Sequence, residues 1–169
     1  MKKIIFIIFI FSILLNISCT TDVICTESKY VKLNANFYHV IYNDTTKIRT
    51  VYQLSLDSLT VQGLKKDSVT GAYQPVDSIL YKNQNGIVPI YLPLNNYLPE
   101  SVFRFKFKTI SDTMTIYHKN LNDYLSLECG CIVTHSIDTI ITTHHYIDSL
   151  RIIIHDVNTI NAENIRLYK

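Results

Sequence analysis

Four cysteines are the residues of this chain with the clearest chemical potential: Cys19, Cys25, Cys129 and Cys131. A thiol can be acylated, can form a disulfide or can bind zinc. Cys19 follows the basic residues of segment 1–3, the apolar run 4–15 and the small Ser18. This order of charge, apolar run and small residue is typical of a bacterial secretion signal. A cysteine at its end is where a lipoprotein signal is cut and the new N-terminus is acylated.

The apolar run is too short to cross a bilayer, because a spanning helix needs about 20 residues. We therefore expect a signal peptide over 1–18, acylation of Cys19 and a tether over 19–28. The pattern is imperfect, since Asn16 stands at position −3 and the bulky Ile17 at −2. An ordinary secretory cut nearby is the alternative, but Asn16 is a poor small residue for it. Acyl chains on Cys19 would hold the protein to the membrane lipid effectively permanently.

The other three cysteines predict one disulfide in an oxidising compartment. Cys25 follows the anchor closely, and Cys129 and Cys131 flank Gly130. A bridge between the last two is disfavoured, because residues two apart in a strand lie roughly 6.6 Å apart and ring closure is strained. One bridge from Cys25 to either of them is the economical interpretation. Zinc needs about four ligands at suitable spacing, for which this pattern is weak evidence.

Histidines offer a second route to metal or acid–base chemistry. His144 and His145 are adjacent, and adjacent strand residues point to opposite faces, so the two are not expected to bind one ion together. His39 lies on the apolar face of a predicted strand, where we expect a hydrogen-bonded core histidine. Surface or packing roles are favoured for all six histidines, and no metal site is predicted.

Carboxylates and short motifs give no sign of catalysis. Glycosidase chemistry needs two acids facing one cleft, yet nothing marks any two acids of this chain as partners. Four acidic residues lie near predicted turns, where aspartate caps the backbone locally: Asp138, Asp148, Asp156 and Glu163. The chain has no nucleophile elbow and no His-Glu-x-x-His motif, and its four glycines argue against a nucleotide loop. We predict no catalytic residues, no cofactor and no enzyme.

Charge and composition bound the class of protein further. Loss of segment 1–18 removes two of the 16 basic residues and none of the 14 acidic ones, which leaves a neutral mature chain. A neutral chain gives no support to nucleic-acid binding. Twelve tyrosines, seven phenylalanines and no tryptophan, with many β-branched residues, favour β structure. The mature length fits one domain over 29–169.

Alternation of apolar and polar residues predicts an all-β fold. In 102–108 the phenylalanines Phe103, Phe105 and Phe107 share one face, as in a half-buried antiparallel strand. Pro89 and Pro93 place their strand at a sheet edge. Polar segments 65–78 and 82–86 and the pair 111–112 predict a loop and turns. The expected strands cover 30–42, 48–54, 56–64, 78–81, 87–94, 102–108, 114–118, 124–134, 137–146, 150–155 and 165–168.

About nine to eleven short strands at this spacing fit a two-sheet antiparallel β-sandwich of immunoglobulin-like or jelly-roll type. An eight-stranded barrel is the alternative. Tyr38 and Tyr42 share the polar face of the first strand. Exposed tyrosine rows serve as glycan platforms or protein interfaces, but ordinary cross-strand pairing is the favoured interpretation here.

Four short segments carry a resemblance to a known family: 22–25, 90–94, 128–131 and 161–168. In this order and spacing they resemble a family of small, uncharacterised lipoproteins of Bacteroidota, over essentially the whole mature chain. Family members commonly have an aromatic residue after the Cys-Gly pair, where this chain has Cys131. The resemblance therefore implies a Cys25–Cys129 bridge, with Cys131 as the odd, buried thiol. It implies a disulfide-stapled all-β lipoprotein and no activity.

Location and function follow as expectations. Surface-exported lipoproteins of these bacteria carry several acids after the lipid cysteine, whereas 20–23 offers only Asp22. We therefore expect an outer-membrane lipoprotein that faces the periplasm. Its expected role is a non-enzymatic interaction module that binds an envelope protein or outer-membrane β-barrel. The alternative is a lipoprotein that binds a small ligand or glycan.

Overall fold

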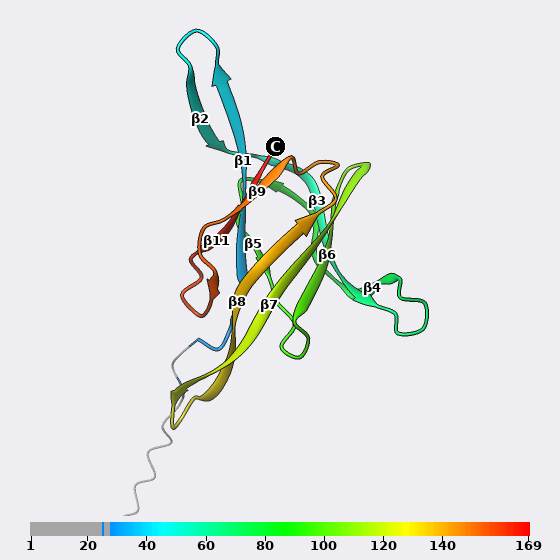
Figure 1. The fold of residues 1–169 in the computed structure, drawn as a ribbon, viewed down its shortest axis with the longest axis vertical. Helices are drawn as coiled ribbons and strands as arrows, with labels where there is room; N and C mark the ends of the chain where they lie inside the picture. Colours follow the sequence, from blue (N-terminus) through cyan, green and yellow to red (C-terminus); the bar gives the residue numbers. More distant parts are fainter. Residues whose placement is uncertain (1–24, 26–27) are drawn as a thin grey trace, which may run out of the picture.

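A computed structural model describes residue 25 and residues 28–169, which form an all-β structure of eleven strands in two sheets (Figure 1). The first sheet has the order β2-β1-β11-β9, with β5 paired to β1. The second has the order β10-β8-β7-β6-β3-β4. Neither order closes on itself, so the fold is the predicted two-sheet sandwich and not a barrel. Within the described part of the chain, no helix is long and apolar enough to cross a membrane.

The strand bounds are as follows: β1 Leu33–Asn43, β2 Ile48–Gln53, β3 Leu56–Lys66, β4 Tyr73–Gly86, β5 Ile90–Leu92, β6 Glu100–Phe107, β7 Ile110–Ser126, β8 Gly130–Thr142, β9 Ser149–Ile152, β10 Asp156–Val157 and β11 Glu163–Tyr168. Neighbouring strands pair antiparallel except β1 and β11, which run parallel. This parallel pair places strands from the two ends of the chain side by side.

The core lies between the sheets and contains the phenylalanines that alternation predicts. Phe103, Phe105 and Phe107 of β6 are all buried, and Phe37 of β1 makes edge-to-face contacts with the last two across the core. Such aromatic pairs add stability beyond their buried area. Among the side chains that the structure describes, every buried polar atom has a hydrogen-bond partner.

Two predicted turns lie inside strands. The predicted loop 65–78 and turn 82–86 overlap β4, which runs unbroken from Tyr73 to Gly86 with several register shifts against β3. Asn83 and Gly86 have the positive φ that a turn would use, but Asn83 lies at a register shift within β4 and Gly86 ends the strand. Asp112 also lies within β7, because the chain reverses earlier, near Lys108, whose φ is 49°.

The longest hairpin joins β7 and β8, and its turn lies inside a segment that was predicted to be one strand. A strand over 124–134 was expected, whereas the chain reverses at residues 127–129 and pairs Ser126 with Gly130. Gly130 has a φ of 72°, a conformation that glycine adopts without strain. The edge prediction for the proline segment is confirmed, since β5 contains only Ile90–Leu92 between the two prolines and pairs with β1 alone.

Candidate functional site

The histidines divide into an exposed set and a buried pair. His39 was predicted in the core but is exposed, because β1 leaves the sandwich at this point; its Nδ1 lies 2.8 Å from the Lys169 carbonyl oxygen. His144 and His145 lie in the loop after β8 and not on a strand. Across residues 25 and 28–169, no three histidine, cysteine or acidic side chains are grouped as metal ligands.

The buried pair, His118 of β7 and His135 of β8, belongs to a polar network inside the sandwich. His118 Nε2 lies 2.9 Å from Ser101 Oγ, and His118 Nδ1 lies 2.9 Å from Asn120 Oδ1. His135 Nδ1 lies 2.8 Å from the same Asn120 oxygen. Burial lowers the pKa of His135 to about 4, helped by the neighbouring His118, and burial also lowers the pKa of His118. Both rings are therefore neutral at pH 7.

This order of serine, histidine and amide is that of a nucleophile, its base and an orienting group. Ser101 Oγ, however, already accepts the Asn95 backbone N–H at 2.8 Å. Asn120 Nδ2 donates to the Leu98 carbonyl oxygen. The network therefore fastens the loop between β5 and β6 to the sheet. No local motif marks this network, because His118 and Asn120 are two residues apart but Ser101 lies 17 residues before His118 and His135 lies 15 residues after Asn120.

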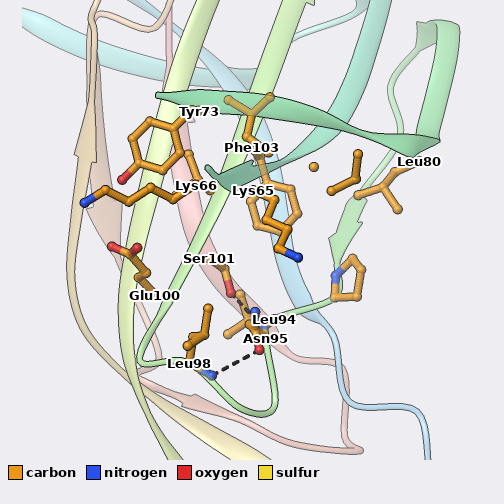
Figure 2. Close-up of a pocket in the computed structure, with 15 residues that line it drawn as sticks. Lys65, Lys66, Tyr73, Leu80, Leu94, Asn95, Leu98, Glu100, Ser101 and Phe103 are labelled. Atoms are coloured by element: carbon orange, nitrogen blue, oxygen red, sulfur yellow. Dashed lines mark hydrogen bonds between the residues drawn. The ribbon is translucent and has the colours of Figure 1, made fainter. Parts of the chain in front are cut away.

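A cleft of about 310 Å³ opens beside this network, between the β3–β4 hairpin, the start of β6 and the β5–β6 loop (Figure 2). In this view Lys65, Lys66 and Tyr73 lie toward one end of the cleft and Leu94 and Leu98 toward the other. Most of its lining is apolar, and its volume is at the low end for small-molecule sites. Its apolar lining residues are Gly63, Leu64, Val76, Leu80, Pro93, Leu94, Leu98, Val102 and Phe103.

Charge at the cleft is predominantly positive. Lys65 and Lys66 both border the cleft, against the single carboxylate of Glu100, and Figure 2 shows their side chains pointing to opposite sides, as expected for adjacent strand residues. Within the part of the chain that the structure describes, neither lysine forms an ion pair. An apolar cleft bordered by unneutralised cations favours a ligand with an apolar body and an anionic head.

Asp112 is a fully buried carboxylate that holds the loop after β8. Its two oxygens accept the backbone N–H groups of His145, Tyr146 and Ile147 at 2.6 to 2.8 Å, and also the Thr143 hydroxyl. Burial alone would raise its pKa, but these hydrogen bonds outweigh burial and bring the pKa to about 2. Met114 and Ile116 point inward on β7. The same two-residue alternation, continued back by one step, would have predicted that Asp112 is buried.

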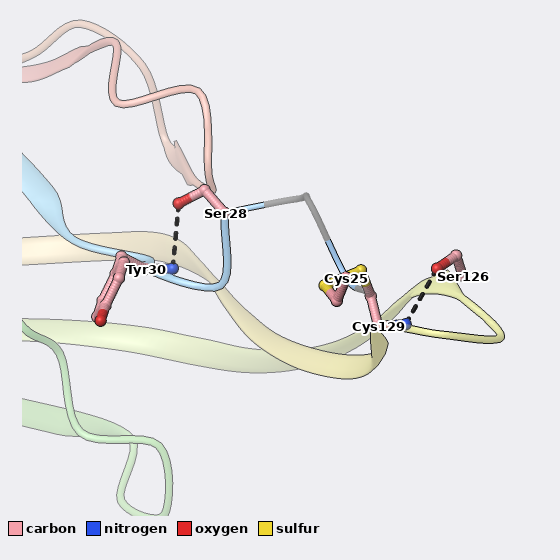
Figure 3. The surroundings of a disulfide bond; sticks show 5 residues. All are labelled: Cys25, Ser28, Tyr30, Ser126 and Cys129. Atoms are coloured by element: carbon pink, nitrogen blue, oxygen red, sulfur yellow. Dashed lines mark hydrogen bonds between the residues drawn. A yellow bond between two sulfur atoms is a disulfide. The ribbon is translucent and has the colours of Figure 1, made fainter. Parts of the chain in front are cut away.

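The Cys25–Cys129 disulfide that the resemblance implies is present, with Cα atoms 4.9 Å apart (Figure 3). It closes a sequence separation of 104 residues and joins the N-terminal segment to the β7–β8 turn, where Cys129 N–H donates to Ser126 Oγ. Cys131 is an exposed free thiol, not a buried one. On β8 the neighbouring Ile132 takes the inward position, so Cys131 faces outward. Cys19 and segment 1–18 lie outside the described residues.

The distal half of the β1–β2 hairpin carries apolar side chains that no other part of the described structure covers. It extends beyond the sandwich at one end of the long axis (Figure 1), and every residue of β2 is exposed. β2 is also an edge strand, so its outer backbone groups have no neighbouring strand. The large exposed side chains are Ile41, Tyr42, Ile48, Val51 and Tyr52.

The predicted tyrosine pair does not form a ligand pocket. Tyr38 donates its hydroxyl to Glu163 at 2.5 Å, and its ring lies 6.0 Å from that of Tyr168 on the neighbouring strand. Tyr42 lies on the hairpin, beside the Lys47 side chain. Neither tyrosine lines the cleft. Tyr38 therefore packs against Tyr168 on the neighbouring strand, as the favoured cross-strand interpretation predicts.

Comparison with known proteins gives one result. A family model described as "Family of unknown function (DUF6452)" matches residues 58–169. No curated protein and no solved structure matches the chain.

Proposed function

The chain belongs to the DUF6452 family of unknown function, and we propose that it is a lipid-anchored, non-enzymatic protein-interaction module of the bacterial cell envelope. The resemblance to Bacteroidota lipoproteins and the cysteine after the secretion signal support an anchor on acylated Cys19. A single acid at Asp22 supports an outer-membrane location facing the periplasm. Protease shaving of intact cells tests this location, because loss of the protein without lysis would contradict it.

The observation that carries the proposal is the exposed β1–β2 hairpin. Ile41, Ile48 and Tyr52 occupy one face of the hairpin and Tyr42 and Val51 the other, as the register requires. An exposed apolar edge strand is a template for pairing with another chain. A partner that adds an extended strand to β2 would satisfy its free backbone groups and place apolar side chains beside those on both faces. We infer that the partner is an envelope protein that contributes such a segment.

A pull-down of the tagged, lipidated protein from its own envelope in mild detergent tests the proposal. We expect a stoichiometric partner that is lost with Val51→Lys in the hairpin. The matched control is Ile160→Lys, at an exposed apolar residue outside the strands, which should retain the partner. Cys19→Ala should also lose the partner, because the protein is then no longer anchored to the membrane. Equal recovery with Val51→Lys and Ile160→Lys would contradict the hairpin as the binding surface.

The cleft favours a second candidate function, the binding of a small anionic amphiphile. Titration calorimetry with decanoate and with neutral decanol tests it. We expect decanoate to bind more tightly, and this preference to disappear in Lys65→Gln/Lys66→Gln. Lys82→Gln, an exposed lysine of β4 outside the cleft lining, is the control. Equal binding of decanoate and decanol by the unaltered protein would exclude this ligand class.

A further inference from the structure

The β7–β8 turn carries a second group of uncovered apolar side chains, at the end of the molecule opposite the β1–β2 hairpin (Figure 1). Leu127 lies in the turn and is 90% exposed, and Tyr124 of β7 is 61% exposed. Leu121, further along β7, is half exposed. A side chain as exposed as Leu127 contributes little to the core, and with Tyr124 and Leu121 near the same turn it is available to contact another apolar surface.

The disulfide fixes this turn to the N-terminal segment. Cys129 is two residues from Leu127 and is bonded to Cys25. Cys25 follows Cys19 by six residues, which span at most about 20 Å when fully extended. If Cys19 carries acyl chains in the bilayer, as the proposed function holds, the turn therefore stands within roughly that distance of the lipid headgroups.

We propose that the β7–β8 turn is a membrane-contacting surface, with Leu127 and Tyr124 inserted in the interface of the bilayer that holds acylated Cys19. Tyrosine is enriched at that interface, because its ring is apolar and its hydroxyl is polar. Asp123 and Glu128 are exposed beside it and disfavour anionic headgroups. The contact is therefore apolar, prefers zwitterionic lipid and persists at high salt.

This contact orients the whole molecule. The disulfide and the turn face the bilayer, and the β1–β2 hairpin points away from it, toward the periplasmic space (Figure 1). A free N-terminal tether would leave the sandwich to tumble about its anchor. Attachment at Cys25 instead holds the hairpin at a fixed distance from the bilayer, where its apolar faces can bind a partner.

Single-tryptophan fluorescence tests the proposal, since the chain has no tryptophan of its own. Full-length lipidated Leu127→Trp is reconstituted in phosphatidylcholine vesicles that contain brominated phosphatidylcholine, which quenches tryptophan near the acyl chains. The matched variant is Ile48→Trp in the hairpin, also highly exposed. We expect Leu127→Trp to be quenched and blue-shifted and Ile48→Trp to be neither. High salt should leave the difference unchanged.

Separate readouts distinguish the possible failures. Flotation of the protein with the vesicles reports the lipid anchor, and its absence would overturn the proposed anchoring together with this inference. Flotation with an unquenched Leu127→Trp would overturn the membrane contact alone. A Leu127→Trp that is unquenched by lipid yet shielded from acrylamide would assign the turn to a protein neighbour instead. Cys25→Ser/Cys129→Ser, if its melting curve shows a folded protein, should float and lose the quenching.

Discussion

The inner strand β6 and the outer half of β1 show the same alternation of apolar residues but opposite environments. In β6, Phe105 is completely buried, with Phe103 and Phe107 beside it. In β1, Ile41 is half exposed although it continues the same face as the buried Phe37. Alternation decides which side chains share a face. Whether that face is buried depends on how far the opposing sheet extends.

The difference separates residues that hold the fold from residues free for binding. Phe105 packs against Phe37 across the sandwich and is surrounded by core side chains. Ile41 and its hairpin neighbours have no opposing sheet, so their apolar surface adds little to folding stability. Folding stability does not account for the five large exposed apolar side chains of this hairpin, and the proposed partner binding rests on them.

The largest effect is expected from truncation in β6. Phe105→Ala should lower the free energy of unfolding by about 4 kcal/mol, because it leaves a cavity between the sheets. Ile41→Ala in the hairpin should lower it by less than about 0.5 kcal/mol. Urea unfolding measures both. Comparable losses at the two sites would mean that the hairpin is packed after all.

Asp112→Asn should destabilise the protein by about 3–4 kcal/mol, since the amide cannot accept all the hydrogen bonds of the charged carboxylate. The pKa of about 2 lies below the ordinary value of 3.8 for aspartate, so this stabilisation is complete above pH 4 and is lost as the pH falls toward 2. Urea unfolding in that range measures it. The control Asp148→Asn, at an exposed ion pair with Lys169, should change stability by less than about 0.5 kcal/mol.

Loss of the disulfide should cost about 3 kcal/mol, because the bridge restricts the unfolded chain over 104 residues. Cys25→Ser and Cys129→Ser should show similar losses by thermal unfolding without reductant. Cys131→Ser should cost much less, since that thiol is free and exposed. Equal losses for Cys129 and Cys131 would contradict the pairing.

A shift from pH 7 to pH 5 should reduce stability by about 2 kcal/mol through His135. Its folded pKa of about 4 lies below the ordinary 6.5, so the unfolded chain binds a proton in this range and the folded chain does not. The loss begins below pH 6.5 and is complete near pH 4. His135→Gln should flatten this part of the curve. An unchanged slope in His135→Gln would assign the pH dependence elsewhere.

Local sequence patterns predicted much of the fold but little of its polar interior. The alternation of apolar and polar residues predicted that the phenylalanines of β6 point inward. Pro89 and Pro93 predicted that β5 lies at a sheet edge. Ser101, His118 and Asn120 show no motif, because their contact arises only when β6 and β7 pair and the β5–β6 loop closes on them. The cleft could not be predicted from the sequence either, since Lys65 and Leu94 come to line one cleft only through folding.

The sequence by itself determined that the chain is a β-sandwich and, through the resemblance, which cysteines pair. Side-chain periodicity and composition are local properties, so they can be read from the sequence without knowing how the strands are arranged. Tertiary structure decided that Ile41, His39 and Cys131 are exposed, that Asp112 is a buried acceptor, and that the β1–β2 hairpin and the β7–β8 turn lie at opposite ends. Burial and position depend on which strands oppose one another, and no stretch of sequence contains that information alone.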